Sequence, residues 1–352
     1  MTSMDPTSAA PASMPADVHP APAATPPRSV HLTVLDGWRG ISILLVLAAH
    51  LLPLGPKPWQ LNEAAARFGM AIFFTLSGFL ITRLLLADTK ITDFLIRRFL
   101  RIIPLAWLAM AIAFPLTDVA TSSYLPNSLF YANLPPIRLT AVASHLWSLC
   151  VEMQFYLAVA MIVLVAGARG LLLLPLLSIA VTVLRVVDGA YLDIVTWHRV
   201  DEILAGVTLA LIFSERLGAA AVRVLARCNV YWLLPLAAIT CHPDAGFMNY
   251  LRPYVVALLV GSTLYAPPAS ARAVLSSRIL KYLATISFAL YVIHGILMET
   301  WLGKGDLLVK YAKRPLLFAL TFALAHLSTF HYEARWIALG KRLTQRRRVD
   351  ER

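Results

Sequence analysis

The stretch Leu35-Asp-Gly-Trp-Arg-Gly-Ile-Ser-Ile-Leu-Leu-Val-Leu-Ala-Ala-His50 decides how this chain is built. It is largely apolar, as is typical of a helix that crosses a bilayer, and about 20 such residues are needed for the crossing. Arg39 and His50 are eleven residues apart, which places them within about 20° of each other on one helix face, about 16 Å apart along the axis. An ionised side chain at mid-bilayer costs about 2.5–3.5 kcal/mol, so each residue is a functional candidate. Alternatively, Arg39 reaches the headgroups and His50 is a packing residue.

The whole chain has the same apolar character. Of its 352 residues, 59% are hydrophobic and 14% are charged, and the mean hydropathy is +0.70. Soluble proteins have about 45–50% apolar and about 25% charged residues. The composition therefore excludes a soluble enzyme and a chain that is disordered throughout. We expect an all-α, polytopic transmembrane helical bundle.

Cysteine and charge exclude further classes of protein. Three cysteines cannot form a disulfide framework, and they fall at no metal-ligand spacing, so no metal site is expected. The net charge of +12 is confined to loops, which does not indicate nucleic-acid binding.

Apolar runs alternate with short polar connections from Leu35 onward, and they predict ten membrane-spanning helices, with nine or eleven as alternatives. The predicted spans are 35–54, 66–87, 101–120, 146–167, 170–187, 201–216, 230–242, 250–267, 279–300 and 315–337.

The two ends differ from the apolar middle. Residues 1–30 contain seven prolines and are predicted to be a disordered cytoplasmic tail. Residues 31–338 form the predicted transmembrane domain, and 339–352 a basic cytoplasmic tail. With the N-terminus inside, the inner loops and the C-terminal tail carry more Lys and Arg than the outer loops. The positive-inside rule therefore predicts that both termini lie in the cytoplasm of a multi-pass cell (inner) membrane protein.

A second basic group, Arg97, Arg98 and Arg101, opens the third predicted span at its inner face. Positive-inside anchoring explains such a group as well as function does. The functional alternative is an anion clamp, because Arg98 and Arg101 are three residues apart on one helix face and two guanidinium forks can hold phosphate.

Other ionisable and polar residues mark two levels of the predicted bundle. Glu152 lies about one turn inside the fourth span, while His294 occurs at a similar depth in the ninth and Asp201 begins the sixth. Glu333 lies near the inner end of the tenth span, where it alternatively pairs with Arg335. The inner level holds Arg39, Arg98, Arg101 and Glu333, and the outer level holds His50, Glu152, His294 and Asp201.

Taken together, these motifs resemble the integral-membrane acyltransferase type 3 family, which includes bacterial O-antigen and exopolysaccharide acetylases and macrolide acylases. The similarity runs from Leu35 to about Glu333. The motifs that carry it are Leu35-Asp-Gly-Trp-Arg-Gly40 with the Arg39-x10-His50 spacing, Phe73-Phe-Thr-Leu-Ser-Gly-Phe-Leu-Ile81, Arg97-Arg98-x-x-Arg101-x-x-Pro104, Trp147-Ser-Leu-x-Val-Glu152-x-Gln-Phe-Tyr156, Arg199-x-Asp201 with Gly206, Ser287 to His294, and Glu333.

The resemblance implies a ten-helix core and acyl transfer from acyl-CoA, commonly acetyl-CoA, to a carbohydrate hydroxyl. It also implies that Arg39 and His50 are essential and that Arg98 and Arg101 bind the donor. Two departures stand out. The chain ends soon after the tenth span, so a second step by a periplasmic SGNH-type esterase domain is expected to be supplied elsewhere or absent. The Pro that commonly follows the late Glu is replaced by Ala334.

Acyl transfer to a hydroxyl requires a base, and a histidine is suited to that role near neutral pH. We therefore expect His50 to be the general base, with Glu152 as a candidate to orient it, and Arg39, Arg97, Arg98 and Arg101 to hold CoA phosphates. Direct transfer is preferred, while Ser77 and Ser148 keep a covalent acyl-enzyme open. The candidates for binding the substrate or supporting the site are Trp147, Ser148, His294, Asp201 and Glu333.

Three alternatives to a carbohydrate acylase remain open at this stage. They are an acylase of a macrolide-like small molecule, a carrier or flippase that makes no bond, and a membrane-bound O-acyltransferase of the lipid- or protein-modifying kind. No permanently bound cofactor and no nucleic acid are expected. The expected partners are acyl-CoA, a hydroxylated acceptor and the bilayer, and the oligomeric state is left open.

Overall fold

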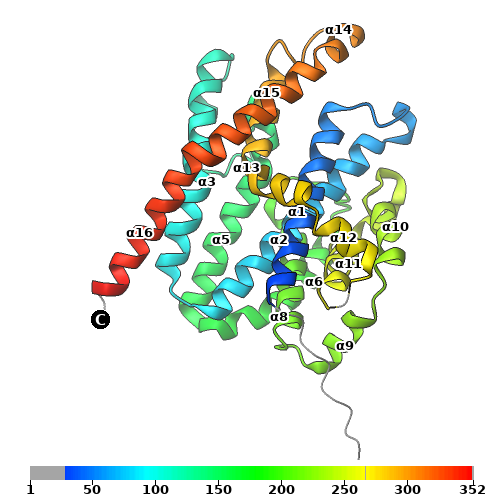
Figure 1. Cartoon of the computed structure of the whole chain (residues 1–352), viewed down its shortest axis with the longest axis vertical. Helices are drawn as coiled ribbons and strands as arrows, with labels where there is room; N and C mark the ends of the chain where they lie inside the picture. The colour runs from blue at the N-terminus through cyan, green and yellow to red at the C-terminus, as the bar shows by residue number, and fades with distance from the viewer. Residues whose placement is uncertain (1–27, 266, 351–352) are drawn as a thin grey trace, which may run out of the picture.

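The computed structural model describes residues 28–265 and 267–350 (Figure 1). Within these ranges the chain is helical, with no strand. Positions 1–27 of the predicted disordered tail lie outside the described residues. The predicted basic tail over 339–352 continues a helix as far as Asp350. The helices are α1 (Arg28–Leu51), α2 (Leu61–Ala87), α3 (Ile91–Ala113), α4 (Tyr124–Ser128), α5 (Trp147–Ala166), α6 (Leu174–Val187), α7 (Thr196–Arg199), α8 (Asp201–Phe213), α9 (Ala219–Arg227), α10 (Val230–Cys241), α11 (Arg252–Tyr265), α12 (Ala269–Leu275), α13 (Arg278–Glu299), α14 (Leu307–Ala312), α15 (Arg314–Leu327) and α16 (Ala334–Asp350).

Several helical stretches of the described chain are long and apolar enough to cross a membrane. Five qualify by length and composition: Thr33–Leu51, Lys57–Ala87, Ile91–Leu116, Ala141–Val187 and Arg278–Glu299. The number rises to seven if each of two bent pairs counts as one span. These pairs are Ala219–Arg227 with Val230–Cys241, bent by 88°, and Pro243–Tyr265 with Ala269–Leu275, bent by 102°. The protein is therefore a multi-pass membrane protein that is all-helical over the residues that the structure describes, and the count of ten spans stays a prediction.

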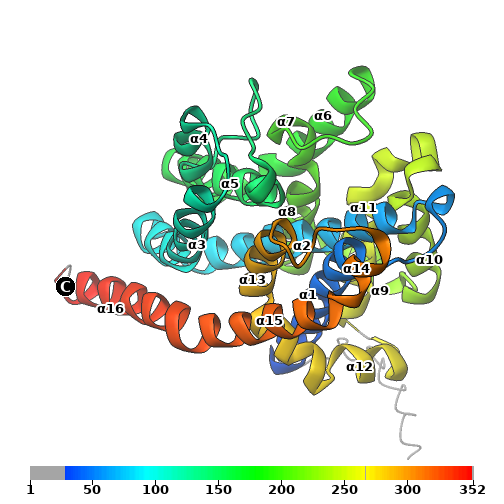
Figure 2. The same cartoon turned by 90° about the horizontal axis from the view of Figure 1, so that it is seen from above.

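Helix α2 is central to the packing, because it runs against both α1 and α8 (Figure 2). Glycines allow the α2–α8 contact to be unusually close. A Cβ on Gly78 would lie 1.9 Å from the carbonyl oxygen of Ile203, and a Cβ on Gly206 would lie 2.1 Å from that of Thr75. Small residues at such positions let helix backbones approach each other, as is common in membrane bundles.

The C-terminal helices form a long run along one side of the molecule (Figure 1). A π-helical segment, Ser328–Glu333, joins α15 to α16, so the predicted span over 315–337 runs through it. In this segment the Glu333 carboxylate accepts hydrogen bonds from the hydroxyls of Ser328 and Thr329, at 3.2 and 3.1 Å. Helix α15 packs on α13, and α16 packs on α3. Helix α13 in turn packs on α1 and on α3.

Candidate active site

An arginine-lined cavity of about 70 Å³, here called the arginine cavity, lies between α1, α2, α3, α5 and α13. Arg39 of α1 and Arg98 and Arg101 of α3 contribute its positive charge. All three side chains are only partly buried. The structure thus brings together in one cavity the three arginines that the sequence placed on one level.

Glu152 of α5 lies in the same cavity and is 5% exposed. Its Oε1 accepts a hydrogen bond from Ser77 Oγ at 2.6 Å and another from the Tyr156 hydroxyl. One carboxylate therefore faces three guanidinium groups in this cavity, which leaves an excess of positive charge. Such an excess favours an anionic ligand.

A second cavity, of about 750 Å³, is lined by three histidines and is here called the histidine cavity. His50, at the end of α1, is exposed, whereas His294 of α13, which also lines the cavity, is fully buried. The rings of His50 and His294 stack, with their centroids 5.2 Å apart. His145, from the turn that precedes α5, is the third histidine.

The hydrogen bonds of this pair determine which ring nitrogens carry protons. His294 Nδ1 lies 3.0 Å from the carbonyl oxygen of Leu290, which can only accept, so Nδ1 carries a hydrogen. In neutral His294 the other nitrogen, Nε2, is then an acceptor, and it lies 3.0 Å from His50 Nδ1. His50 Nδ1 must therefore donate, which leaves the lone pair on His50 Nε2 available as a base.

The two cavities are neighbours, because Val46, Met70 and Tyr291 line both of them. The Tyr291 hydroxyl donates to the carbonyl oxygen of His145 and therefore accepts from Ser148 Oγ, at 2.6 Å. A side chain held by two hydrogen bonds thus stands at the boundary between the arginines and the histidines.

The structure corrects the sequence-based placement of two carboxylates. Glu152 was expected beside His50, but it lies in the arginine cavity, and His294 is the partner of His50. Asp201 was expected in the outer site, but it is fully buried against Arg185 and lines neither cavity.

The remaining candidates also fall into groups. Trp147 lines the histidine cavity, and Ser148 supports Tyr291. Arg97 donates from Nε and Nη2 to Thr344 of α16 and lies outside both cavities. Glu333 is held within its π-helical segment and lines neither cavity.

The sequence-based reasoning gave no role to Tyr291. The signal was present, because Tyr291 lies three residues before His294 and shares its helix face.

Comparisons with known proteins show which family the chain resembles in sequence. Residues 32–330 match the sequence model of an acyltransferase domain family. The Peptidoglycan O-acetyltransferase OatA of Listeria monocytogenes is 30% identical over 148 residues, which are 35% of this chain and 22% of that protein. The "Putative peptidoglycan O-acetyltransferase YrhL" of Bacillus subtilis is 28% identical over 225 residues, which are 52% of this chain and 33% of that protein.

The matched segments thus span a third or less of these relatives' own length. No solved structure matches the chain. The family match alone covers most of the 352 residues, from the start of the first apolar helix into the π-helical segment before α16. On this ground the chain belongs to the acyltransferase type 3 family.

Proposed function

We propose that the protein is a membrane O-acyltransferase that moves an acyl group, which we expect to be acetyl, from acyl-CoA to a carbohydrate hydroxyl. The observation that carries this proposal is the pair of adjoining cavities, one rich in arginine and one with a histidine poised as a base. Family membership and the names of the matched O-acetyltransferases support the reaction type. We further propose that the protein lies in the cell (inner) membrane.

The arginine cavity is the proposed donor site. CoA carries several phosphates, and Arg39, Arg98 and Arg101 supply charge-assisted donors for them. A cavity of about 70 Å³ is far too small for the whole of CoA. We therefore expect the acyl end to enter it while the phosphates stay at its mouth, where the partly buried arginines reach them.

The histidine cavity is the proposed acceptor site. As the acceptor oxygen attacks the thioester carbonyl, His50 Nε2 takes the hydroxyl proton and later returns it to the departing thiolate of CoA. The products are the ester and free CoA, so atoms and charge balance. A positioned base of this kind contributes about 10²–10⁴-fold in rate. Tyr291 lies where the two substrates would meet.

The test is CoA release by the purified protein incubated with acetyl-CoA and an acceptor glycan. A carrier or flippase would release no CoA, and an acylase of macrolide-like molecules would prefer such an acceptor. Comparing surface and secreted glycans of the host with and without the gene, for alkali-labile esters, identifies the acceptor class.

The donor site has its own test. Changing Arg98 or Arg101 to Ala should remove a contact worth about 1.5–3 kcal/mol and weaken acyl-CoA binding roughly 10–150-fold. Lys should restore only part of the affinity, because an ammonium lacks the planar fork. Arg97→Ala is the matched control, since Arg97 bonds Thr344 outside the cavity. If the Arg98/Arg101 double variant binds acyl-CoA with unchanged affinity, this pair serves only to anchor the protein in the membrane.

A further inference from the structure

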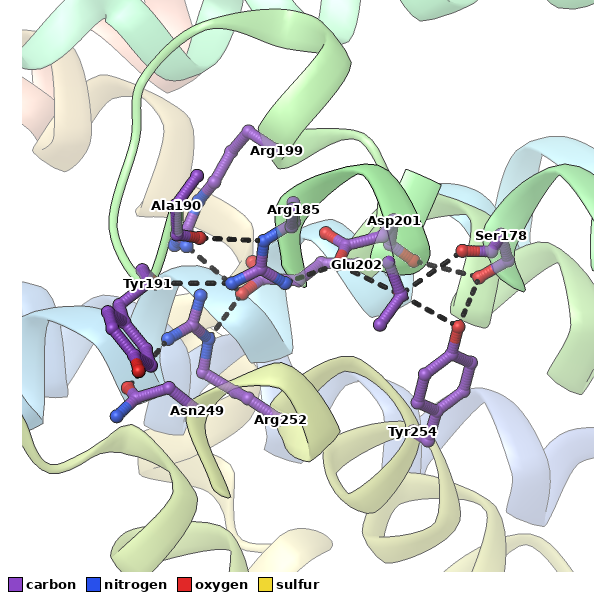
Figure 3. A network of polar contacts seen from close by, with 11 residues as sticks. Ser178, Arg185, Ala190, Tyr191, Arg199, Asp201, Glu202, Asn249, Arg252 and Tyr254 are labelled. Atoms are coloured by element: carbon purple, nitrogen blue, oxygen red, sulfur yellow. Dashed lines mark hydrogen bonds and ion pairs between the residues drawn. The ribbon is translucent and has the colours of Figure 1, made fainter. Parts of the chain in front are cut away.

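A buried cluster of three arginines and two carboxylates lies beside the histidine cavity, which one of its arginines lines; Figure 3 shows the cluster. Arg185 Nη1 donates to Asp201, and Arg252 Nε donates to Glu202 Oε1 at 2.6 Å. The third arginine, Arg199, has its Nη1 3.2 Å from the same Glu202 oxygen. Three guanidinium groups thus share two carboxylates, and each of the five residues is at most 3% exposed. The cluster carries one positive charge in excess.

Arg199 is the member whose charge is least compensated. Its Nε and Nη1 are buried, and neither has a hydrogen-bond partner among the described residues. The guanidinium carbon lies 5.3 Å from the Trp147 ring and 5.9 Å from the Phe74 ring, so aromatic faces provide part of the stabilisation. Arg199 also lines the histidine cavity, whereas Arg185 and Arg252 do not.

The carboxylates that line the histidine cavity do not supply the missing partner. Asp193 Oδ2 is hydrogen-bonded to His198 Nδ1 at 2.6 Å, and Asp193 Oδ1 accepts from two backbone N–H groups. Glu299 lies 3.5 Å from the ammonium of Lys304. Each of these acids thus contacts another basic side chain, and neither is paired with Arg199.

We propose that the histidine cavity binds an acyl acceptor that carries an anionic group, and that Arg199 binds this group. That this ligand is the acyl acceptor rests on the proposed function. Carboxylate and phosphate share the chemistry that a guanidinium recognises. The carboxylate would belong to an acidic sugar and the phosphate to a prenyl carrier lipid. A cavity of about 750 Å³ is in the range that takes a sugar-sized ligand.

Binding can be measured without any acyl donor, from the thermal shift of the purified full chain. One pair of probes is methyl glucuronide and its neutral methyl ester, which present the same ring hydroxyls. The other pair is farnesyl phosphate and farnesol. In one pair, the wild-type protein should bind the anionic member about tenfold or more tightly than the neutral one. The pair that shows this preference identifies the source of the charge.

Two variants assign the preference to Arg199. Arg199→Gln should abolish it, and Arg199→Lys should retain a part, because the charge remains. Arg314→Gln is the matched control: Arg314 is 5% exposed, has two nitrogens without partners among the described residues, and lies outside the histidine cavity. This control should keep the full preference. If Arg199→Gln does not fold, the wild-type comparison and Arg199→Lys still decide.

Equal binding of both members of each pair by the wild-type protein would overturn the proposal. A preference that survives in Arg199→Gln, or that is also lost in Arg314→Gln, would overturn it too. The proposed function is tested separately by CoA release. Preferential binding of the anionic probe without CoA release would support the anion site at Arg199 and contradict the proposed acyltransferase function. CoA release together with equal binding of both members of each pair would do the reverse.

Discussion

At the scale of single residues, the tautomer of His50 depends on one backbone carbonyl group. The Leu290 carbonyl fixes the proton of His294, and His294 in turn fixes the proton of His50. A histidine on an isolated helix interconverts between two tautomers, and only one of them leaves Nε2 free to accept a proton. The contact of α1 with α13 thus determines that Nε2 is the ring nitrogen of His50 that can accept a proton.

Changing His50 to Gln tests this role directly. The amide approximates the shape and hydrogen bonding of the ring but accepts no proton near neutral pH. We expect a folded, membrane-inserted protein that binds acyl-CoA normally, with a turnover that falls by about 10²-fold or more. Thermal stability and acyl-CoA affinity serve as controls. Turnover near that of the wild-type protein would contradict the assignment and make His294 the next candidate.

The candidate site was predictable only in part from the sequence. The helical period predicts that Arg39 and His50 share one stripe of α1, and Arg39 lines the arginine cavity while His50 lines the adjoining histidine cavity. Glu152 was misplaced because the depth of a residue along a helix does not specify which neighbour its side chain faces. That direction is set by how α5 is rotated against α2, where the Ser77 hydroxyl donates a hydrogen bond to the Glu152 carboxylate. Long-range packing of this kind leaves no local pattern in the sequence.

At the scale of elements, the segment between α6 and α8 carries a charge-based clamp outside the membrane-spanning stretches. His198 is hydrogen-bonded to Asp193 at 2.6 Å and to Asp188 at 2.9 Å. Burial alone would lower the pKa of His198, but the hydrogen bonds to Asp193 and Asp188 outweigh it and raise that pKa above the ordinary 6.5. Burial would raise the pKa of Asp193, but its bonds to His198 and to two backbone N–H groups lower it.

This clamp should give the segment a pH-dependent stability. A raised histidine pKa contributes stability that is full below about pH 6.5 and is lost as the pH rises through the folded-state value. The lowered Asp193 pKa contributes stability that is lost only in acid, as the pH falls through its folded-state value. The difference in melting temperature between wild type and His198→Gln should therefore be largest near pH 5 and shrink in alkali. A difference that does not vary with pH would contradict the clamp.

Helix packing makes a second prediction at this scale. Gly78→Ala gains up to about 1 kcal/mol of helix propensity, but its Cβ would meet the backbone oxygen of Ile203 at 1.9 Å. Because a backbone atom cannot move aside cheaply, overpacking of about 1–3 kcal/mol or more should win. We expect a lower melting temperature in detergent. Gly340→Ala is the control, since its nearest neighbour is the Leu100 side chain at 3.4 Å, and it should be neutral or stabilising. Equal stability of both variants would contradict the close α2–α8 contact.

The elements themselves were predicted better than their lengths. The apolar runs over 146–167 and 170–187 coincide closely with α5 and α6. The runs over 201–216, 230–242 and 250–267 gave helices of 13, 12 and 14 residues, shorter than the roughly 20 residues of a straight crossing. Hydropathy reports which residues avoid water, but it does not report where a helix bends, as the two pairs do by 88° and 102°.

At the scale of the whole molecule, the two cavities have an order along α1. Arg39 is nearer to the start of this helix and lines the arginine cavity, while His50 is at its end and lines the histidine cavity. The start of α1 and the end of α16 lie toward the same end of the molecule, opposite to α14 (Figure 1). A cytoplasmic start of α1 would thus turn the arginine cavity toward the compartment that holds acyl-CoA, and it would put the C-terminus there too.

The excess of basic residues in the predicted inner loops favours this orientation, so we predict that both termini are cytoplasmic. A reporter enzyme that is active only outside the cytoplasm should be inactive when fused after Arg352. The same reporter inserted at Gly55, in the connection between α1 and α2, should be active and serves as the control. An active C-terminal fusion together with an inactive fusion at Gly55 would show that the protein has the opposite orientation in the membrane. The arginine cavity would then face away from cytoplasmic acyl-CoA. The donor would have to bind among the histidines, where the buried cation Arg199 shares its carboxylate partner, Glu202, with Arg252.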